Sequence, residues 1–174
     1  MSGSNRFLLD ANVFIEAYRR YYAFPICSGF WLALTREHER SRVFSIDRVS
    51  AELIDRNDDL ARWTRAVPNT FFKRTADRQV VSVFADVMSW VRGERQFKPE
   101  ATAEFAEDAD GWLIAYAKVN GLILVTHEVI APDAQAKVPI PNVCVEFGVP
   151  YVDTFEMLHS LKVCFGLRKR RKKN

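Results

Sequence analysis

Apolar residues along the chain follow two different spacings. Longer segments with an apolar residue every three or four positions predict helices, and short β-branched or aromatic runs predict buried strands. The predicted strands are residues 7–10, 42–46, 122–126 and the PYVDT segment at 150–154. The predicted helices are residues 12–20, 28–40, 47–56, 59–67, 75–93, 109–119 and 154–163. A polar stretch containing Pro99 precedes the helix at 109–119, and the segment 129–142, rich in Pro and Ala, predicts a loop.

Strands that alternate with helices indicate an α/β fold in which helices cover both faces of a parallel sheet. The chain of 174 residues has no internal repeat, which predicts one domain over residues 1–167 and a separate tail over 168–174. In open sheets of this kind, ligands bind beyond the carboxyl ends of the strands. Residues that directly follow a strand are therefore the candidates for a functional site.

Composition narrows the class of protein. Hydrophobic residues make up 48% and charged residues 27%, which is typical of a folded globular domain. The apolar runs are far shorter than the roughly 18–20 residues that cross a bilayer, and the N-terminus lacks a signal-peptide pattern. Neither the histidines nor Cys27, Cys144 and Cys164 have zinc-ligand spacing. We therefore expect buried thiols in a cytoplasmic protein that has no membrane segment and no zinc site.

The net charge of +3 conceals a basic tail. Residues 168–173 are all basic, and the rest of the chain carries 19 basic and 22 acidic residues. Such a block is typical of a disordered segment, which either neutralises the phosphates of a nucleic acid or only aids solubility. The candidate RNA contacts in it are Arg168, Lys169, Arg170 and Arg171.

The first predicted strand runs directly into a carboxylate, in the segment FLLDANVFIEAYRR at residues 7–20. Asp10 or Asn12 is typical of a helix N-cap, because a short polar side chain accepts hydrogen bonds from the free N–H groups of the first turn. The alternative is that Asp10 belongs to a functional site. That alternative requires other carboxylates to converge on the same edge of the sheet.

A second acidic position opens the segment EDADGWLIAYAKVNG at residues 107–121. Asp110 lies on the same helical face as Leu113, Ile114 and Ala117, so it heads the apolar stripe that faces the core. A carboxylate there is costly unless something pairs with it, which favours a site. Asp108 lies about 200° away around the helix and suits the N-cap instead.

Two further acidic residues have a similar placement. Glu52 lies at the edge of the core-facing side of its predicted helix, although an ordinary exposed glutamate fits the pattern too. Glu128 ends LILVTHE, where the alternation of a strand places Thr126 on the same side and His127 on the other.

Asp10, Glu52, Asp110 and Glu128 thus come from separate segments that meet at one end of the sheet. Carboxylates this close repel one another, and a divalent cation removes that repulsion. Acidic oxygen ligands suit Mg²⁺ or Mn²⁺, which activate water and stabilise charge on a phosphoryl oxygen. Asn12 and Thr126 are candidates to orient that water or a ligand carboxylate.

Four segments, FLLDANVFIEA, SAEL, DADGWLIAYA and LILVTHE, resemble in order and spacing the four acidic motifs of PIN-domain nucleases. The segments RRYYAFPICSGFW and IPNVCVEFGVPYVDTFEML are similar to an uncharacterised bacterial subfamily of PIN-like proteins. The resemblance covers roughly residues 6–165.

The resemblance implies a three-layer α/β/α sandwich around a mainly parallel sheet and a Mg²⁺- or Mn²⁺-dependent endoribonuclease. By position, Asp10, Glu52 and Asp110 would be the core metal ligands, with Asn12 as the polar companion of Asp10. The fourth acidic position is commonly Asp and here is Glu128, whose extra methylene lengthens its reach. Many PIN proteins are toxins of toxin–antitoxin pairs, so RNA, a cognate antitoxin and a second copy of the chain are the implied partners.

The cluster YRRYYAF mixes basic and aromatic residues in a way that has two interpretations. Arg19 and Arg20 are candidate RNA contacts, and aromatic rings stack on bases. Packing of Tyr21, Tyr22 and Phe24 against the second helix is the alternative.

Two rival functions fit parts of the pattern. A haloacid-dehalogenase-like phosphatase also has a carboxylate after its first strand, but it usually needs a second carboxylate where this chain has Asn12. A binding module that kept the fold and lost the activity is the other rival.

Overall fold

The computed structural model describes residues 5–166 and has a parallel sheet at its centre. Its five strands stand in the order β3-β2-β1-β4-β5, and each neighbouring pair is parallel. The strands are β1 (Phe7–Leu9), β2 (Val43–Ile46), β3 (Phe72–Lys73), β4 (Ile123–Val125) and β5 (Tyr151–Val152).

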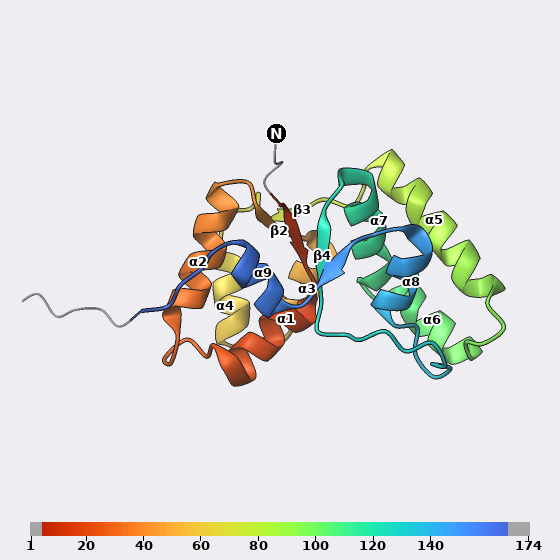
Figure 1. Ribbon diagram of the computed structural model, residues 1–174, viewed down its shortest axis with the longest axis horizontal. Coiled ribbons are helices and arrows are strands. Elements are labelled where there is room, and N and C mark those ends of the chain that lie inside the picture. The colour runs from red at the N-terminus through yellow and green to blue at the C-terminus, as the bar shows by residue number, and fades with distance from the viewer. Residues whose placement is uncertain (1–4, 167–174) are drawn as a thin grey trace, which may run out of the picture.

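Helices cover both faces of this sheet. They are α1 (Ala11–Glu16), its π-helical continuation η1 (Ala17–Tyr21), α2 (Ser28–Glu39), α3 (Asp47–Asp55), α4 (Asp59–Ala66), α5 (Arg78–Gly93), α6 (Pro99–Glu107), α7 (Asp110–Asn120), α8 (Ile140–Phe147) and α9 (Thr154–Ser160). Figure 1 shows α1, α2, α4 and α9 on one side of the strands and α5 to α8 on the other. The protein is therefore a three-layer α/β sandwich with a parallel sheet, as predicted.

Three elements differ from the predictions. β3 is only two residues long, so no alternating pattern marks it. α6 begins at Pro99, in a polar stretch for which no element was predicted, and buries only Ala101 and Phe105. α8 begins inside the predicted loop 129–142 and carries Pro141 in its first turn, where the missing N–H breaks no helical hydrogen bond. Each element is short or has a proline in its first turn, and both features weaken a sequence pattern.

β1 is the middle strand, and its register decides which residues emerge side by side at the carboxyl end of the sheet. Leu9 pairs with Val125 of β4, and the Asp10 N–H donates to the Val125 carbonyl at 3.0 Å. On the other side, the Ser45 hydroxyl donates to the Leu9 carbonyl at 2.6 Å. Asp10 and Thr126 therefore leave their strands side by side, at the carboxyl end of the sheet.

The aromatic residues after α1 pack against the second helix. Tyr22 stacks on Phe30 with ring centroids 4.5 Å apart, and Phe24 stacks on Trp31 at 4.3 Å. The indole N–H of Trp31 also donates to the Tyr22 carbonyl at 2.7 Å. Of the two interpretations of YRRYYAF, packing holds for Tyr22 and Phe24, whereas Tyr21 is half exposed and meets the edge of Phe155.

The three cysteines are all free thiols but differ in burial. Cys144 is buried in α8, Cys27 is half-buried before α2, and Cys164 is exposed after α9. The prediction of buried thiols is therefore wrong for Cys164, because the chain beyond α9 runs over the surface.

The predicted basic tail, with its candidate RNA contacts Arg168 to Arg171, lies outside residues 5–166. Within that range, no helix is both long and apolar enough to cross a membrane.

Leu8 tests whether β1 is the centre of the core. Its side chain is 0% exposed, so Leu8→Ala should lower the free energy of unfolding by about 2–5 kcal/mol in urea denaturation. Leu32→Ala is the matched control, because Leu32 is 69% exposed and its truncation should cost about 0.5 kcal/mol or less. Equal losses in the two variants would place Leu8 outside the core.

Candidate functional site

Asp10 is buried at the start of α1, and its carboxylate is used for a tertiary contact. The residue occupies the N-cap position of α1, but its side chain makes no capping hydrogen bond. Instead, Oδ2 accepts a bond of 2.9 Å from the Thr126 hydroxyl after β4. Of the two interpretations of Asp10, capping is therefore wrong and a role in a site at the sheet edge is favoured.

Thr126 connects three polar groups at this edge. Besides donating to Asp10, its hydroxyl oxygen accepts bonds from Asn12 Nδ2 at 2.9 Å and from the Glu128 N–H at 3.2 Å. Asn12 Oδ1 in turn accepts from the His127 N–H at 3.1 Å. The network fixes the first turn of α1 against the segment that follows β4, so Asn12 and Thr126 hold the Asp10 carboxylate in one orientation.

Asp110 reaches the same edge from a helix on one side of the sheet. It is the first residue of α7, and its side chain is half-buried. Its position in the first turn favours a negative charge, because the free N–H groups of a helix N-terminus carry partial positive charge. The predicted N-cap, Asp108, is wrong: Ala109 occupies that position, and Asp108 is an exposed residue that follows α6.

Glu52 and Glu128 complete the predicted set in different surroundings. Glu52 lies on α3 and is exposed. Glu128 is half-buried, and its Oε2 accepts a 2.7 Å hydrogen bond from the N–H of Ile140 at the start of α8. Its other oxygen forms an ion pair with the Lys137 amine.

The charges of these carboxylates act on one another. Burial raises the pKa of Asp10 to about 7; the Thr126 hydrogen bond lowers it, and the charges of Glu128 and Glu52 raise it. Burial also raises the pKa of Asp110 to about 8, and the charges of Asp10 and Glu128 act in the same direction. The charge of Asp10 thus interacts with the charges of the other three acidic positions, which the sequence placed on separate segments.

The two exposed acids, Glu52 and Asp108, also have raised pKa values. Partial loss of hydration and the charge of Asp108 raise the pKa of Glu52, against a lowering by Arg56. The pKa of Asp108 is raised by loss of hydration and by Glu104, while Lys137 lowers it. Asp108 thus belongs to the acidic surroundings of the site, although the sequence suggested only a capping role.

Lys137 is a charged neighbour of the carboxylates that sequence reasoning missed. Burial alone lowers the pKa of its amine, but the hydrogen bond to Glu128 and the charges of Glu128, Asp110 and Asp10 outweigh this and raise it. Lys137 also lines a small hollow with Glu104, Asp108 and Asp110. The one available signal was that Lys137 is the only basic residue in the predicted loop 129–142.

The candidate RNA contacts that lie within the described residues are on η1. Arg19 and Arg20 are both exposed, and Arg20 forms an ion pair of 3.2 Å with Glu16 one turn earlier. An exposed pair of this kind leaves the guanidinium free to rearrange, since it contributes little to stability.

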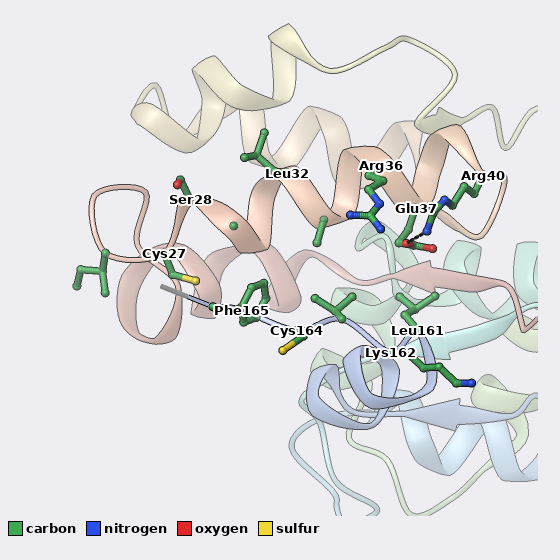
Figure 2. Close-up of a pocket in the computed structure, with 15 residues that line it drawn as sticks. Cys27, Ser28, Leu32, Arg36, Glu37, Arg40, Leu161, Lys162, Cys164 and Phe165 are labelled. Atoms are coloured by element: carbon green, nitrogen blue, oxygen red, sulfur yellow. Dashed lines mark hydrogen bonds and ion pairs between the residues drawn. The ribbon is translucent and has the colours of Figure 1, made fainter. Parts of the chain in front are cut away.

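A large groove lies away from the carboxylates. Its volume is about 870 Å³, and its walls are α2 and the segment 161–166 after α9. Figure 2 shows Leu32 and Arg36 on the helix wall and Phe165 on the opposite segment. None of the four carboxylates lines it, so the groove is separate from the acidic site.

The four carboxylates are the type of oxygen ligand that cations take, but in this structure they are not arranged as a metal site. Within residues 5–166, no three His, Cys, Asp or Glu side chains form a group that could hold a metal ion as they stand. Two of the four carboxylates already have protein partners, Thr126 on Asp10 and Lys137 on Glu128. An ion that used this oxygen of Glu128 as a ligand would have to displace the Lys137 amine.

The fold is thus that of a three-layer α/β sandwich with a parallel sheet, and carboxylates follow the carboxyl ends of its strands. The chain belongs to the family described as domain of unknown function (DUF4411), whose model matches residues 7–165. A comparison with curated proteins finds no significant match.

The raised pKa values of Asp10 and Asp110 predict how stability depends on pH. Both carboxyls titrate near 3.8 when unfolded and at about 7 and 8 when folded, so the folded state binds more protons between these values. The free energy of unfolding should therefore fall as pH rises from about 4 to about 8. Calorimetry in the presence of a chelator measures this dependence.

Asp110→Asn isolates one carboxyl, because the amide keeps the shape and cannot ionise. The variant should melt several degrees higher than the parent near pH 8 and much closer to it near pH 5, since each kcal/mol shifts Tm by about 2–4 °C. Asp86→Asn, at an exposed position of α5, is the control. A stabilisation by Asp110→Asn that is independent of pH would contradict the assigned titration.

Proposed function

We propose that this protein is a divalent-metal-dependent endoribonuclease of the PIN type. The observation that carries the proposal is the meeting of Asp10, Glu52, Asp110 and Glu128 at the carboxyl edge of the sheet, where each charge acts on another. The order of the four acidic motifs along the chain supports the same conclusion.

The chemistry of the donors fits Mg²⁺ or Mn²⁺. All four side chains are carboxylates, the hard oxygen ligands that these ions take, and burial of Asp10 and Asp110 makes their shared negative charge costly without a cation. Asp10, Glu52 and Asp110 would hold the ion, with Glu128 as a fourth ligand. When bound, the ion supplies an activated water and stabilises negative charge on a phosphoryl oxygen.

The chain's own residues prepare the site for that chemistry. Thr126 and Asn12 fix the rotamer of Asp10, so one buried ligand is preorganised before the ion arrives. The exposed Glu52 leaves one side of the site open to a strand of RNA. A toxin role, with an antitoxin or a second copy of the chain as partner in the cytoplasm, is part of the proposal that the motif resemblance suggests.

One observation favours a second candidate, a binding module that has lost the activity. The Lys137–Glu128 ion pair places a protein cation in the acidic cluster, where it offsets part of the negative charge without a metal. A phosphatase has less support, because Asn12 occupies the position of the second carboxylate and is bonded to Thr126 and His127.

Cleavage of labelled RNA tests the proposal directly. The protein should cleave single-stranded RNA with Mn²⁺ or Mg²⁺ and not with chelator. Asp110→Asn should reduce the rate by at least roughly 100-fold, because loss of groups that only orient a ligand already costs 10- to 100-fold. The exposed Glu100→Gln on α6 is the matched control and should cleave like the parent.

Three other results would each reject the nuclease proposal. Equal cleavage by Asp110→Asn identifies a contaminating enzyme, and hydrolysis of small phosphate esters instead of RNA identifies a phosphatase. RNA binding without cleavage in either metal identifies the binding module.

Lys137→Met tests whether the lysine amine and the ion compete for the same carboxylates. Removing this cation should tighten Mn²⁺ binding by roughly tenfold or more, because like charges about 4 Å apart repel by ~1–4 kcal/mol near a protein surface. Paramagnetic resonance of free Mn²⁺ measures the affinity without any RNA. Lys118→Met, at the opposite end of α7, should leave it unchanged, and weaker binding by Lys137→Met would show that the amine supports the site.

A further inference from the structure

The groove between α2 and segment 161–166 exposes three large apolar side chains. Ile26 and Leu32 are 78% and 69% exposed at the start of α2, and Phe165 is 40% exposed on the opposite wall. The core does not need Leu32, because α2 reaches it through other side chains such as Phe30. Exposed apolar side chains that gather on one surface mark a site of interaction with another molecule.

The two ends of this groove differ in chemistry. Figure 2 shows Leu32 and Phe165 near one end. Near the other end lie the basic side chains of Arg36, Arg40 and Lys162. Arg36 and Arg40 follow Leu32 by four and eight residues, which is about 6 and 12 Å along a helix axis. An apolar end and a basic end are therefore separated by one to two helical turns.

The acid of the groove does not cancel this positive charge at the surface. Among the described residues that line the groove, Glu37 is the only acid, and it is 3% exposed. Its carboxylate pairs with Arg40 at 2.9 Å and with Arg42 at 3.2 Å, so its charge is used inside the protein. Arg36 and Lys162 are exposed. The exposed charges of the groove are therefore all positive.

Three other occupants fit these observations less well. The basic residues 168–173 begin two residues after Gly166, and their charge has the same sign as that of the groove. A second copy that used the same groove would bring a lining whose acid, Glu37, is already paired. RNA would contact the cations but leave the apolar surface of Ile26 and Leu32 uncovered.

We propose that this groove binds an acidic amphipathic helix of a partner protein. Proteins take up such helices by burying their apolar face in a groove. The apolar residues of the partner helix contact Leu32 and Phe165, and its acids, one to two turns further along, meet Arg36 and Arg40. Opposite charges at this end fix the direction and the specificity of binding. The inference does not rest on the nuclease proposal, since none of the four carboxylates lines the groove.

Three labelled synthetic peptides test the groove by fluorescence anisotropy. The first has roughly 16 residues, long enough to be helical in water, with leucines on one face and glutamates one and two turns further along that face. The second has lysine in place of every glutamate, and the third has the composition of the first in scrambled order. The first should bind the full chain at least roughly tenfold more tightly than the other two, because like charges across an interface are strongly unfavourable.

Leu32→Ala tests the apolar end. Loss of this contact should weaken binding of the acidic peptide by roughly fivefold or more, and the fold is kept because Leu32 is exposed. Val145→Ala is the matched control, since Val145 is 61% exposed on α8, on the other side of the sheet (Figure 1), and should leave the affinity unchanged.

Arg36→Glu tests the basic end by exchanging the charge preference. The variant should bind the acidic peptide roughly tenfold or more weakly and should bind the lysine peptide more tightly than the parent does. A folding defect would weaken both, so a gain for the lysine peptide separates charge from misfolding. Arg92→Glu, at an exposed position near the end of α5, is the control and should change neither affinity.

The other possible results each overturn the inference. Equal affinity of the parent for the three peptides does so, and so does parental affinity in both Leu32→Ala and Arg36→Glu. A dimer in sedimentation velocity that Leu32→Ala abolishes would assign the groove to a second copy. Displacement of the acidic peptide by oligoadenylate, whose own binding Arg36→Glu abolishes, would assign it to RNA. Cleavage enters none of these measurements, so the nuclease proposal and this one can fail separately.

Discussion

Negative charge buried at the end of a parallel sheet is the constraint around which this structure is arranged. Asp10 leaves the central strand and Asp110 opens α7, and both carboxyls lie where water reaches them poorly. Two charges in such a place repel each other unless hydrogen bonds, helix termini or cations offset the repulsion. The structure supplies each of these: the Thr126 hydroxyl on Asp10, the N-terminus of α7 under Asp110, and the Lys137 amine on Glu128.

The parallel topology explains why such different segments reach one edge. Every strand runs in the same direction, so the residues after β1 and β4 emerge together, and the Leu9–Val125 register brings Asp10 beside Thr126. α7 leads into β4 and therefore runs back toward the amino ends of the strands. Its first residue, Asp110, lies at the carboxyl end of the sheet. The site is thus a consequence of strand direction together with the placement of acids at strand and helix ends.

The surroundings of the acidic site divide into parts with different chemistry. The loop before α8 carries Lys137 into the cluster. Phe84 of α5 and Arg48 of α3 stack on Trp112 of α7. The large groove between α2 and segment 161–166 arises differently, because Phe165 passes over Gly29, where any Cβ would lie 3.2 Å from its ring.

The sequence by itself determined the α/β class, four of the five strands and the acids that follow strands or head helices, because these depend on local periodicity. It gave a wrong cap for Asp108 and missed α6 and α8, whose limits depend on prolines and on few buried residues. Only the tertiary structure decided that Lys137 pairs with Glu128 and that Arg48 lies on Trp112. These contacts join residues whose spacing along the chain carries no periodic signal, so packing of the layers alone brings them together.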